Sequence, residues 1–200
     1  MKKSNFINPN LINDDLTKTI AVEAKTGQGK THTILNHIVK PLIQSNSALI
    51  YIDIKGDTPT SEEIKNFAIQ ENRLNDFILN NKINQKKLKK QIYDTLNHKK
   101  ILILTLPSLQ NSRNSNKNTL EIIIHTIKEI LTNGNRCDIS TKNTTNIIFD
   151  GYEERNPLQS HIDLSIINEN IRNLSNIGLT ISSQKEISKS FDIDILITKD

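Results

Sequence analysis

Residues 19–31 read Thr-Ile-Ala-Val-Glu-Ala-Lys-Thr-Gly-Gln-Gly-Lys-Thr, and this stretch decides the fold. Its first five residues, Thr19 to Glu23, are typical of a buried strand, and the apolar residues from Ile34 to Val39 have helical spacing. Between them lies a loop with two glycines that ends in Lys-Thr. A strand, a glycine-bearing loop and a helix in this order are typical of a phosphate-binding site.

The loop from Ala24 to Thr31 matches the P-loop (Walker A) pattern, with alanine at the first position, where glycine is commoner. Small residues let successive backbone N–H groups close around phosphate oxygens, and the N-terminus of the next helix adds further N–H groups. Lys30 is expected to contact the β- and γ-phosphates, and the Thr31 hydroxyl to bind Mg²⁺. The predicted nucleotide-binding residues are Thr26, Gly27, Gln28, Gly29, Lys30, Thr31 and His32. The flanking strand and helix argue against a chance glycine-rich turn.

Length and composition predict one domain in a reducing compartment. The chain has 200 residues, a net charge of +4 and a single cysteine, Cys137, which excludes an internal disulfide. No apolar segment follows the two N-terminal lysines as in a signal peptide, and no apolar run has the length of a membrane span. We expect a cytoplasmic protein with a polar lead-in at residues 1–16 and a single P-loop ATPase domain at residues 17–200.

Short apolar segments alternate with segments of helical spacing along the rest of the chain. Strands are predicted at 19–23, 48–54, 101–106, 146–150, 179–183 and 193–198, and helices at 60–78, 88–96, 118–131 and 164–174. Strands that are apolar at nearly every position belong to parallel sheets covered on both faces. The pattern predicts an α/β fold of the RecA-like P-loop NTPase type, with a mainly parallel sheet and helices on both faces.

A P-loop needs an acidic partner for Mg²⁺ at the end of a neighbouring strand, and two aspartates compete for this role. Asp53 ends one apolar strand, and Asp53-Ile54-Lys55-Gly56 resembles the Asp-x-x-Gly of GTPases, but no Asn/Thr-Lys-x-Asp guanine-binding motif accompanies it. Asp150 ends another strand and has Glu153 and Glu154 close behind it, either of which could orient or deprotonate water. We favour Asp150 as the metal carboxylate, with Asp53 as the alternative. A structural interpretation of Asp150 is a strand-end acid that caps the turn before Gly151.

The order of these landmarks resembles that of the HerA–FtsK superfamily of ring ATPases, which includes conjugative (type IV secretion) coupling proteins and viral DNA-packaging ATPases. Beside the P-loop, residues 51–57 resemble the Asp-x-Lys-Gly-Glu/Asp strand end of coupling proteins. Residues 101–109 resemble the strand before Walker B, and residues 147–150 resemble Walker B itself. Residues 177–184 are similar to the family's strand that ends in a γ-phosphate-sensing glutamine, here Gln184.

The resemblance implies an ATPase that uses ATP and Mg²⁺, forms a homo-oligomeric ring (a hexamer), and drives DNA translocation in conjugative transfer, type IV secretion or DNA packaging. It also implies an arginine that acts on the next subunit's nucleotide, for which we favour Arg172. The candidates for that role are Arg73, Arg113, Arg136, Arg155 and Arg172. The partner complex would be a membrane-associated secretion complex or a packaging complex, with no insertion of this chain into the membrane.

The chain departs from the family in one place that matters for activity. The family usually has glutamate directly after the Walker B aspartate, and Gly151 stands there. Either Glu153 or Glu154 takes over that role, or hydrolysis is slow. Gly151 therefore favours the alternative of an ATP-dependent switch or assembly protein with little turnover. A small-molecule P-loop kinase with Asp53 as its acid is a third candidate, and it would be a monomer.

The basic residues are concentrated in one segment. Residues 82–100 contain seven lysines and a single acid, Asp94. Clustered lysines suit contact with a nucleic-acid backbone, and the candidates for DNA contact are Lys86, Lys87, Lys89 and Lys90. The structural interpretation is the solvated face of an amphipathic helix, because the lysines lie opposite an apolar stripe of Leu88, Ile92 and Leu96. No aromatic residue for base stacking is interleaved with these four lysines.

Overall fold

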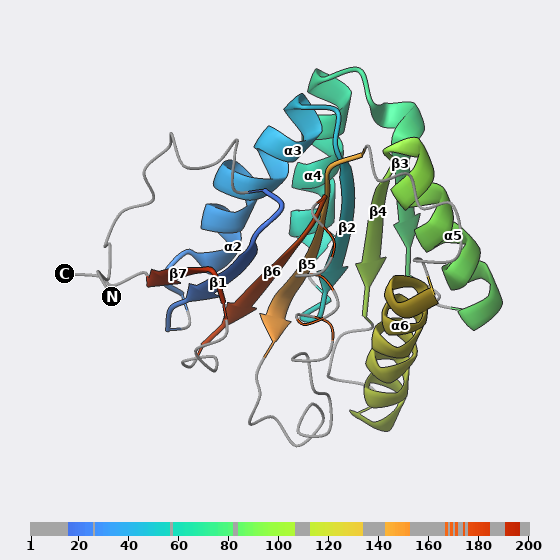
Figure 1. Cartoon of the computed structure of the whole chain (residues 1–200). Coiled ribbons are helices and arrows are strands. Elements are labelled where there is room, and N and C mark those ends of the chain that lie inside the picture. The colour runs from blue at the N-terminus through green and yellow to red at the C-terminus, as the bar shows by residue number, and fades with distance from the viewer. Residues whose placement is uncertain are drawn as a thin grey trace.

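The computed structural model describes residues 16–25, 27–56, 58–81, 84–106, 113–133, 143–152, 176–184 and 191–196, together with residues 167, 169, 171 and 174. Within this part of the chain, seven strands form one sheet in the order β3-β4-β2-β5-β6-β1-β7 (Figure 1). They are β1 (Thr19–Glu23), β2 (Ala48–Asp53), β3 (Phe77–Asn80), β4 (Ile101–Thr105), β5 (Thr145–Tyr152), β6 (Ile177–Ser183) and β7 (Ile193–Leu196). Every neighbouring pair is parallel, as the apolar strands predicted.

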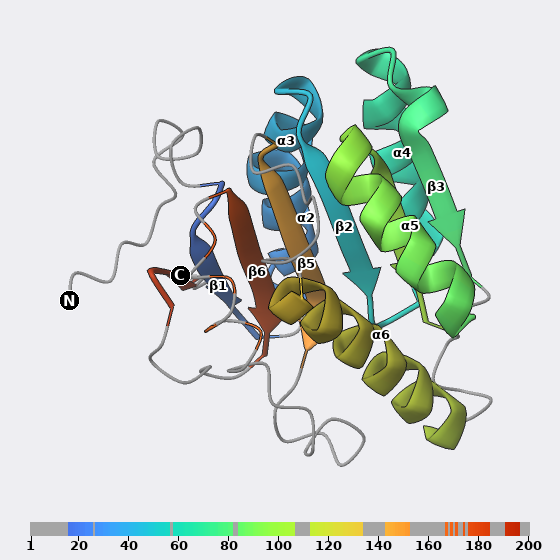
Figure 2. The same ribbon diagram turned by 45° about the vertical axis from the view of Figure 1, so that its right-hand side comes forward.

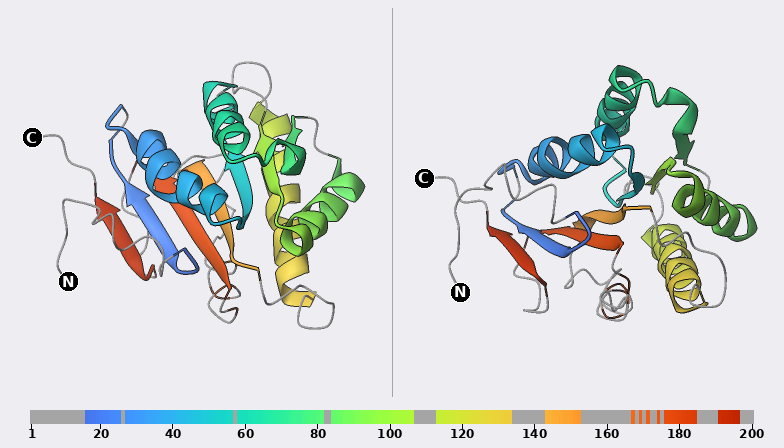
Figure 3. Two further views of the ribbon diagram at one scale, coloured as in Figure 1. Left: turned by 90° about the horizontal axis from the view of Figure 1, so that it is seen from above. Right: turned by 45° about the horizontal axis from the view of Figure 1, so that its top comes forward.

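Helices cover both faces of the sheet. They are α2 (Lys30–Ile34), α3 (Lys40–Gln44), α4 (Thr58–Gln70), α5 (Gln85–His98) and α6 (Arg113–Asn133), with a π-helical turn (Leu35–Val39) that joins α2 to α3. The joined helix α2–α3 and α4 lie on one face, and α5 and α6 lie on the other (Figures 2 and 3). The α/β fold predicted from the sequence is confirmed. None of the helices in the described residues is long and apolar enough to cross a lipid bilayer.

The sheet is buried on both faces because successive residues of each strand point to opposite sides. On one face, Ile34 and Leu42 of the joined helix belong to the same buried cluster as Tyr51. On the other face, Leu88 of α5 and Ile123 of α6 belong to a second cluster that includes alternate residues of β2. This alternation matters for the site, since every second residue near a strand's end faces the helix that follows the P-loop.

One predicted helix is wrong in its second half. The spacing predicted a helix from residue 60 to residue 78, but α4 ends at Gln70 and β3 begins at Phe77. Asn72 adopts a left-handed conformation with φ of 57°, and the Arg73 N–H donates to the carbonyl of Ala68 at 2.6 Å. This is a Schellman ending, in which asparagine tolerates the positive φ. The apolar residues beyond it belong to the edge strand of the sheet, which the sequence pattern did not reveal.

Two further helices differ from expectation or are only partly described. Helix α6 begins at Arg113, whereas the sequence predicted a helix that starts only at residue 118. The apolar stripe that predicted this helix starts at Leu120, so the polar residues before it gave no helical signal. Of the helix predicted at 164–174, the structure describes Ile167 and Ile171, which are helical and buried.

The buried side chain of Arg73 joins the segments that lead into β2, β3 and β4 at the amino edge of the sheet. Its guanidinium donates to the carbonyls of Ile43 at 3.2 Å and Ser47 at 3.0 Å, both before β2. It also donates to the carbonyl of Lys99, just before β4. With 6% of its surface exposed, Arg73 is not available to a neighbouring subunit, which removes it from the five arginines considered for that role.

Replacing Arg73 with alanine is expected to lower the free energy of unfolding by about 3 kcal/mol, because hydrogen bonds to a charged group are worth roughly 1.5–3 kcal/mol each and buried carbonyls would lose their donor. Urea denaturation followed by circular dichroism measures the change. Lys128→Ala, at an exposed position of α6, is the control and should change stability by less than about 0.5 kcal/mol. A loss below about 1 kcal/mol for Arg73→Ala would contradict this role for the buried contacts.

Candidate nucleotide and metal site

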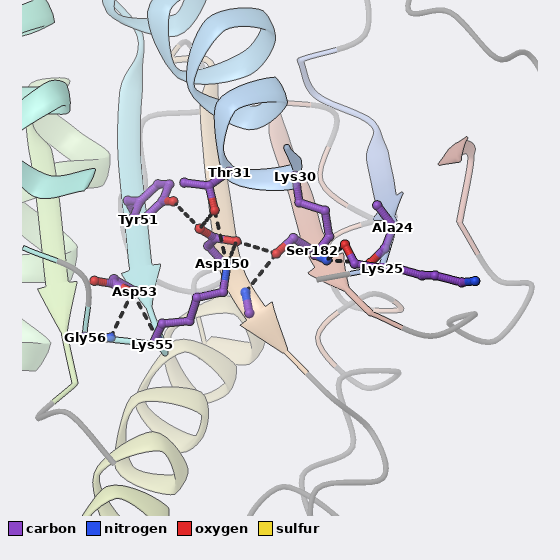
Figure 4. Close-up of polar contacts among 11 residues, drawn as sticks. Ala24, Lys25, Lys30, Thr31, Tyr51, Asp53, Lys55, Gly56, Asp150 and Ser182 are labelled. Carbon is purple, nitrogen blue, oxygen red and sulfur yellow. Dashed lines mark hydrogen bonds and ion pairs between the residues drawn. The ribbon is translucent and has the colours of Figure 1, made fainter. Parts of the chain in front are cut away.

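The candidate site lies at the carboxyl edge of the sheet, where β1, β6, β5 and β2 end (Figure 4). The P-loop leaves β1 here, and the Ala24 N–H donates to the carbonyl of Ser183 at the end of β6, at 3.2 Å. In the sheet order, β6 separates β1 from β5. The carboxyl ends of parallel strands are where open α/β sheets bind their ligands.

Two glycines of the P-loop have a left-handed backbone conformation. Gly27 and Gly29 have φ of 77° and 90°, a region that favours glycine. A Cβ atom added at either position would meet no atom within 4 Å, so space is open beside both residues. The Gln28 side chain closes the loop on itself, because its Oε1 accepts from the Lys25 N–H at 2.7 Å. The loop therefore keeps its curvature and leaves room for an anion.

Lys30 opens helix α2 and is only 6% exposed. Its Nζ donates to the carbonyls of Ala24 at 2.5 Å and Lys25 at 3.1 Å. The ammonium is thus held against the P-loop itself, within the loop that the sequence assigns to phosphates. This position fits the predicted contact with a nucleotide's phosphates.

Asp150 is the centre of a buried hydrogen-bond network. It is 1% exposed, and three hydroxyl groups from three different elements donate to its carboxylate. Thr31 of α2 and Tyr51 of β2 donate to Oδ2 at 2.9 Å and 2.8 Å, and Ser182 of β6 donates to Oδ1. The structure therefore brings together the P-loop threonine and the aspartate favoured from the sequence.

A nearby cation completes the surroundings of Asp150. Lys55, which follows β2, has its Nζ 3.4 Å from Asp150 Oδ1 and 3.2 Å from Thr31 Oγ1. Burial works to raise the pKa of the Asp150 carboxyl, but the charge of Lys55 and the three hydroxyl donors together lower it by more. The net pKa lies below the ordinary value, so Asp150 is ionised at neutral pH.

Asp53 has a different role in the structure. It is the register partner of Asp150 in the parallel pair β2–β5, yet its Oδ1 accepts from the backbone N–H groups of Lys55 at 3.1 Å and Gly56 at 3.0 Å. It caps the turn that leaves β2, and Gly56 in that turn has a φ of 72°. Of the two aspartates, Asp150 contacts Thr31, while Asp53 accepts from its own turn.

Only some of the other predicted nucleotide-site residues are among those that the structure describes. His32 is exposed in the first turn of α2, where its carbonyl accepts from the Asn36 amide at 3.0 Å. Gln184 is exposed and lies one residue past β6, whose end is bonded to the start of the P-loop. Four predicted site residues lie outside the described residues: Thr26, Glu153, Glu154 and Arg172.

The candidates for DNA contact lie on α5. Three of them are exposed, namely Lys86, Lys87 and Lys90, and the fourth, Lys89, forms an ion pair with Glu129 of α6.

Sequence reasoning missed three residues of the network: Tyr51, Lys55 and Ser182. Tyr51 could have been found from the alternation of side chains in a strand. It lies two residues before Asp53, the last residue of β2, so the two side chains point to the same face of the sheet. The buried Ser182 gave a second signal, since a small polar residue at the end of an otherwise apolar strand indicates a polar neighbour. Lys55 carried no signal of its own beyond its place in the Asp-x-Lys-Gly motif.

The residues present fit a magnesium ion and phosphates. A threonine hydroxyl and an ionised carboxylate in contact are the hard oxygen ligands that Mg²⁺ prefers, and Mg²⁺ in such sites takes its remaining ligands from water and phosphate oxygens. The open P-loop beside them offers backbone N–H groups and a lysine ammonium, which suit anionic oxygens.

Comparisons with known proteins give a match at the level of structure alone. No protein-family model matches the sequence, and no curated protein matches it significantly. The chain is similar to solved structures of the genome packaging NTPase B204 from Sulfolobus turreted icosahedral virus 2. With ATPγS bound, the TM-score is 0.52 at 12% identity, over 93% of this chain and 77% of that chain. With AMPPCP bound, the TM-score is 0.50 at the same identity and coverage.

The flagellar accessory protein FlaH from Methanocaldococcus jannaschii also matches, with a TM-score of 0.38 at 13% identity, over 95% of this chain and 74% of that chain. At such identities, the likeness to B204 concerns the fold. Together with the sheet and the P-loop geometry, it identifies the fold as the α/β P-loop NTPase fold of the RecA-like type, as predicted.

Proposed function

We propose that this chain binds ATP with Mg²⁺, hydrolyses it, and works as one subunit of a ring-forming motor that moves DNA. The observation that carries the proposal is the contact between Thr31 Oγ1 and Asp150 Oδ2, at 2.9 Å, beside the open P-loop. A P-loop hydroxyl and a strand-end carboxylate from distant parts of the chain meet at the place where a nucleotide's metal ion has to be held.

Each residue has a defined task in this proposal. Lys30 and the P-loop N–H groups bind the phosphates, and Thr31 and Asp150 hold Mg²⁺, which neutralises charge on the phosphate oxygens. Glu153 or Glu154 orients the attacking water, Gln184 responds to the γ-phosphate, and Arg172 acts on the neighbouring subunit's nucleotide. The exposed position of Gln184, directly after the strand that bonds to Ala24, supports its part.

The lysines of α5 support contact with DNA. Lys86 and Lys87 lie in the first turn of α5, where their backbone N–H groups are capped by the Asn84 side chain. Helix α5 follows β3 and leads into the parallel strand β4, so its first turn is at the same edge of the sheet as the P-loop. Five strand spacings separate β3 from β1, or roughly 24 Å at ~4.8 Å each. DNA bound there would lie beside the nucleotide edge without covering the P-loop.

The remaining parts of the proposal follow the resemblance to ring ATPases. The ring is a hexamer, the process is DNA packaging or conjugative transfer through a type IV secretion complex, and the chain acts on the cytoplasmic side. The name of the similar B204 structure, a genome packaging NTPase, supports packaging as the first process to test.

A second candidate function, an ATP-dependent switch with little turnover, is favoured by one observation. The position after Asp150 carries no side chain, and the stem of Lys55 occupies the space that a Cβ at Gly151 would need, 2.8 Å from Lys55 Cγ and Cε. No carboxylate can therefore stand directly after Asp150 while Lys55 lies there. Hydrolysis then depends on Glu153 or Glu154.

Single-turnover ATP hydrolysis, with and without double-stranded DNA, tests the motor function. We expect DNA to accelerate turnover about tenfold, and high salt to abolish the acceleration because the contacts are with the DNA backbone. Lys86→Glu/Lys87→Glu should remove most of the DNA effect. The control Lys65→Glu/Lys128→Glu makes the same charge change on α4 and α6 and should keep it.

The same experiment separates the two candidates. Nucleotide binding without turnover in either condition would support the switch and end the motor proposal. A hydrolysis rate that DNA does not change would contradict the DNA partner. A protein that remains monomeric with ATPγS, as measured by light scattering, would contradict the ring.

A further inference from the structure

We propose that Lys55 is a built-in competitor of Mg²⁺, whose ammonium holds the metal position in the nucleotide-free protein and must be displaced when the metal and nucleotide bind. This inference rests on the proposed function, because it concerns the same pair of oxygen ligands. It adds a regulatory element that the P-loop pattern does not contain.

The position of the Lys55 ammonium is the first step of the argument. Its Nζ lies 3.2 Å from Thr31 Oγ1 and 3.4 Å from Asp150 Oδ1 (Figure 4). These are the two side chains that would ligate Mg²⁺. A cation at hydrogen-bond distance from both ligands occupies the space that the metal would need, and two cations at one carboxylate repel each other. Lys55 and Mg²⁺ therefore exclude each other.

The path of the Lys55 stem is the second step. Gly151 has a φ of 89° and no side chain, and an added Cβ would lie 2.8 Å from both Cγ and Cε of Lys55. The backbone of β5 thus leaves a channel for the stem directly beside Asp150. The side chain of Lys55 is 40% exposed, whereas that of Asp150 is 2% exposed. The ammonium can withdraw toward solvent without any rearrangement of the core.

The charge balance explains why a lysine is held there. A buried, ionised carboxylate is costly without a partner, and the Lys55 ammonium supplies the opposite charge in the nucleotide-free state. Lys30 is held by the carbonyls of Ala24 and Lys25. With Mg²⁺ and a nucleotide bound, the metal would neutralise the Asp150 carboxylate in place of Lys55, whose ammonium would then be free to withdraw toward solvent.

The test measures how much Mg²⁺ is needed to tighten binding of a fluorescent ADP analogue, mant-ADP, at pH 8. ADP is used because it lacks the γ-phosphate, to which a free lysine could bind. We expect Lys55→Met to lower the half-saturating Mg²⁺ concentration about tenfold, because the competing cation is gone. Lys55→Arg keeps the charge and should stay within about threefold of the wild type. Lys128→Met is the surface control and should change nothing.

A second variant reaches the same ammonium from the opposite side. Gly151→Ala would push the Lys55 stem out of its channel, so it should also lower the half-saturating Mg²⁺ concentration. In Lys55→Met/Gly151→Ala the two effects should not add, because both act on one contact. Thermal melts accompany each variant, since the positive φ at position 151 strains any residue but glycine. The Lys55→Met result decides the question if Gly151→Ala does not fold.

The outcomes separate this inference from the proposed function. If the wild type binds mant-ADP but Lys55→Met leaves the Mg²⁺ requirement unchanged or raises it, the competition is refuted and the nucleotide site stands. If the wild type binds no nucleotide with or without Mg²⁺, the proposed function fails and the inference fails with it. A fall in the Mg²⁺ requirement for Lys55→Met alone, with both controls near wild type, supports the competition.

Discussion

Lys30→Ala is expected to weaken ATP binding by about 100-fold or more. The ammonium lies against the P-loop, and it is the charged group of the loop that would meet the phosphates. Hydrogen bonds to charged groups are worth roughly 1.5–3 kcal/mol each, and about 1.4 kcal/mol corresponds to a tenfold change in affinity. Fluorescence anisotropy of a mant-ATP analogue, titrated with protein in the presence of Mg²⁺, measures the loss.

Lys40→Ala is a matched control for this variant, because it removes a lysine from the same joined helix. Lys40 lies ten residues further along, where its ammonium is 5.6 Å from the centre of the Phe67 ring. Its replacement should leave the affinity for ATP within about twofold of the wild type and cost at most ~1 kcal/mol of stability, as expected for a cation–π pair. Unchanged ATP affinity and hydrolysis in Lys30→Ala would refute the P-loop assignment.

Asp150→Asn is expected to lower Mg²⁺-dependent hydrolysis by about 100-fold or more, the second large effect. Asparagine has nearly the same shape, but it lacks the charge that would hold the metal, and one of its two polar atoms is a donor facing hydroxyl and ammonium donors. Nucleotide binding in EDTA should change little, because the phosphates contact other residues. Hydrolysis is followed by phosphate release over a range of Mg²⁺ concentrations.

Asp53→Asn provides the comparison, since it makes the same chemical change in the register partner of Asp150. We expect a modest effect on hydrolysis and a loss of stability of about 1 kcal/mol, because an amide oxygen is a weaker acceptor for the two N–H groups of the turn. If Asp53→Asn stops hydrolysis while Asp150→Asn does not, the choice of metal carboxylate is wrong.

The fold was predictable from the sequence where local pattern and tertiary role coincide. Strand β1 has the bounds that were expected, because Thr19 to Glu23 is apolar and β-branched and directly precedes the glycine loop. The parallel sheet followed from strands that are apolar at nearly every position, since only coverage on both faces explains them. The strand Phe77–Asn80 was missed because it is short and lies at the edge, and its residues continue the helical spacing of α4.

The site was predictable in part, for a physical reason. The P-loop residues are consecutive in the sequence, so they can be recognised together as one motif. The network around Asp150 is assembled from β2, β5, β6 and α2, and it depends on the register between strands far apart in sequence. Spacing along the chain does not specify this register, so Tyr51 and Ser182 could not be assigned as neighbours of Asp150. Lys55 needed the further fact that Gly151 leaves its stem a path.

The contacts of Arg73 hold three strands of the sheet together at one end. The carbonyls that this guanidinium binds precede β2 and β4, and Arg73 itself precedes β3, so three adjacent strands are clamped together where they begin. The turn that holds Lys55 follows the opposite end of one of these strands, β2. If the chain exchanges nucleotides as proposed, we expect structural change at the far end of the sheet, while the end that Arg73 joins keeps its geometry and would form the fixed part of each subunit in the proposed ring.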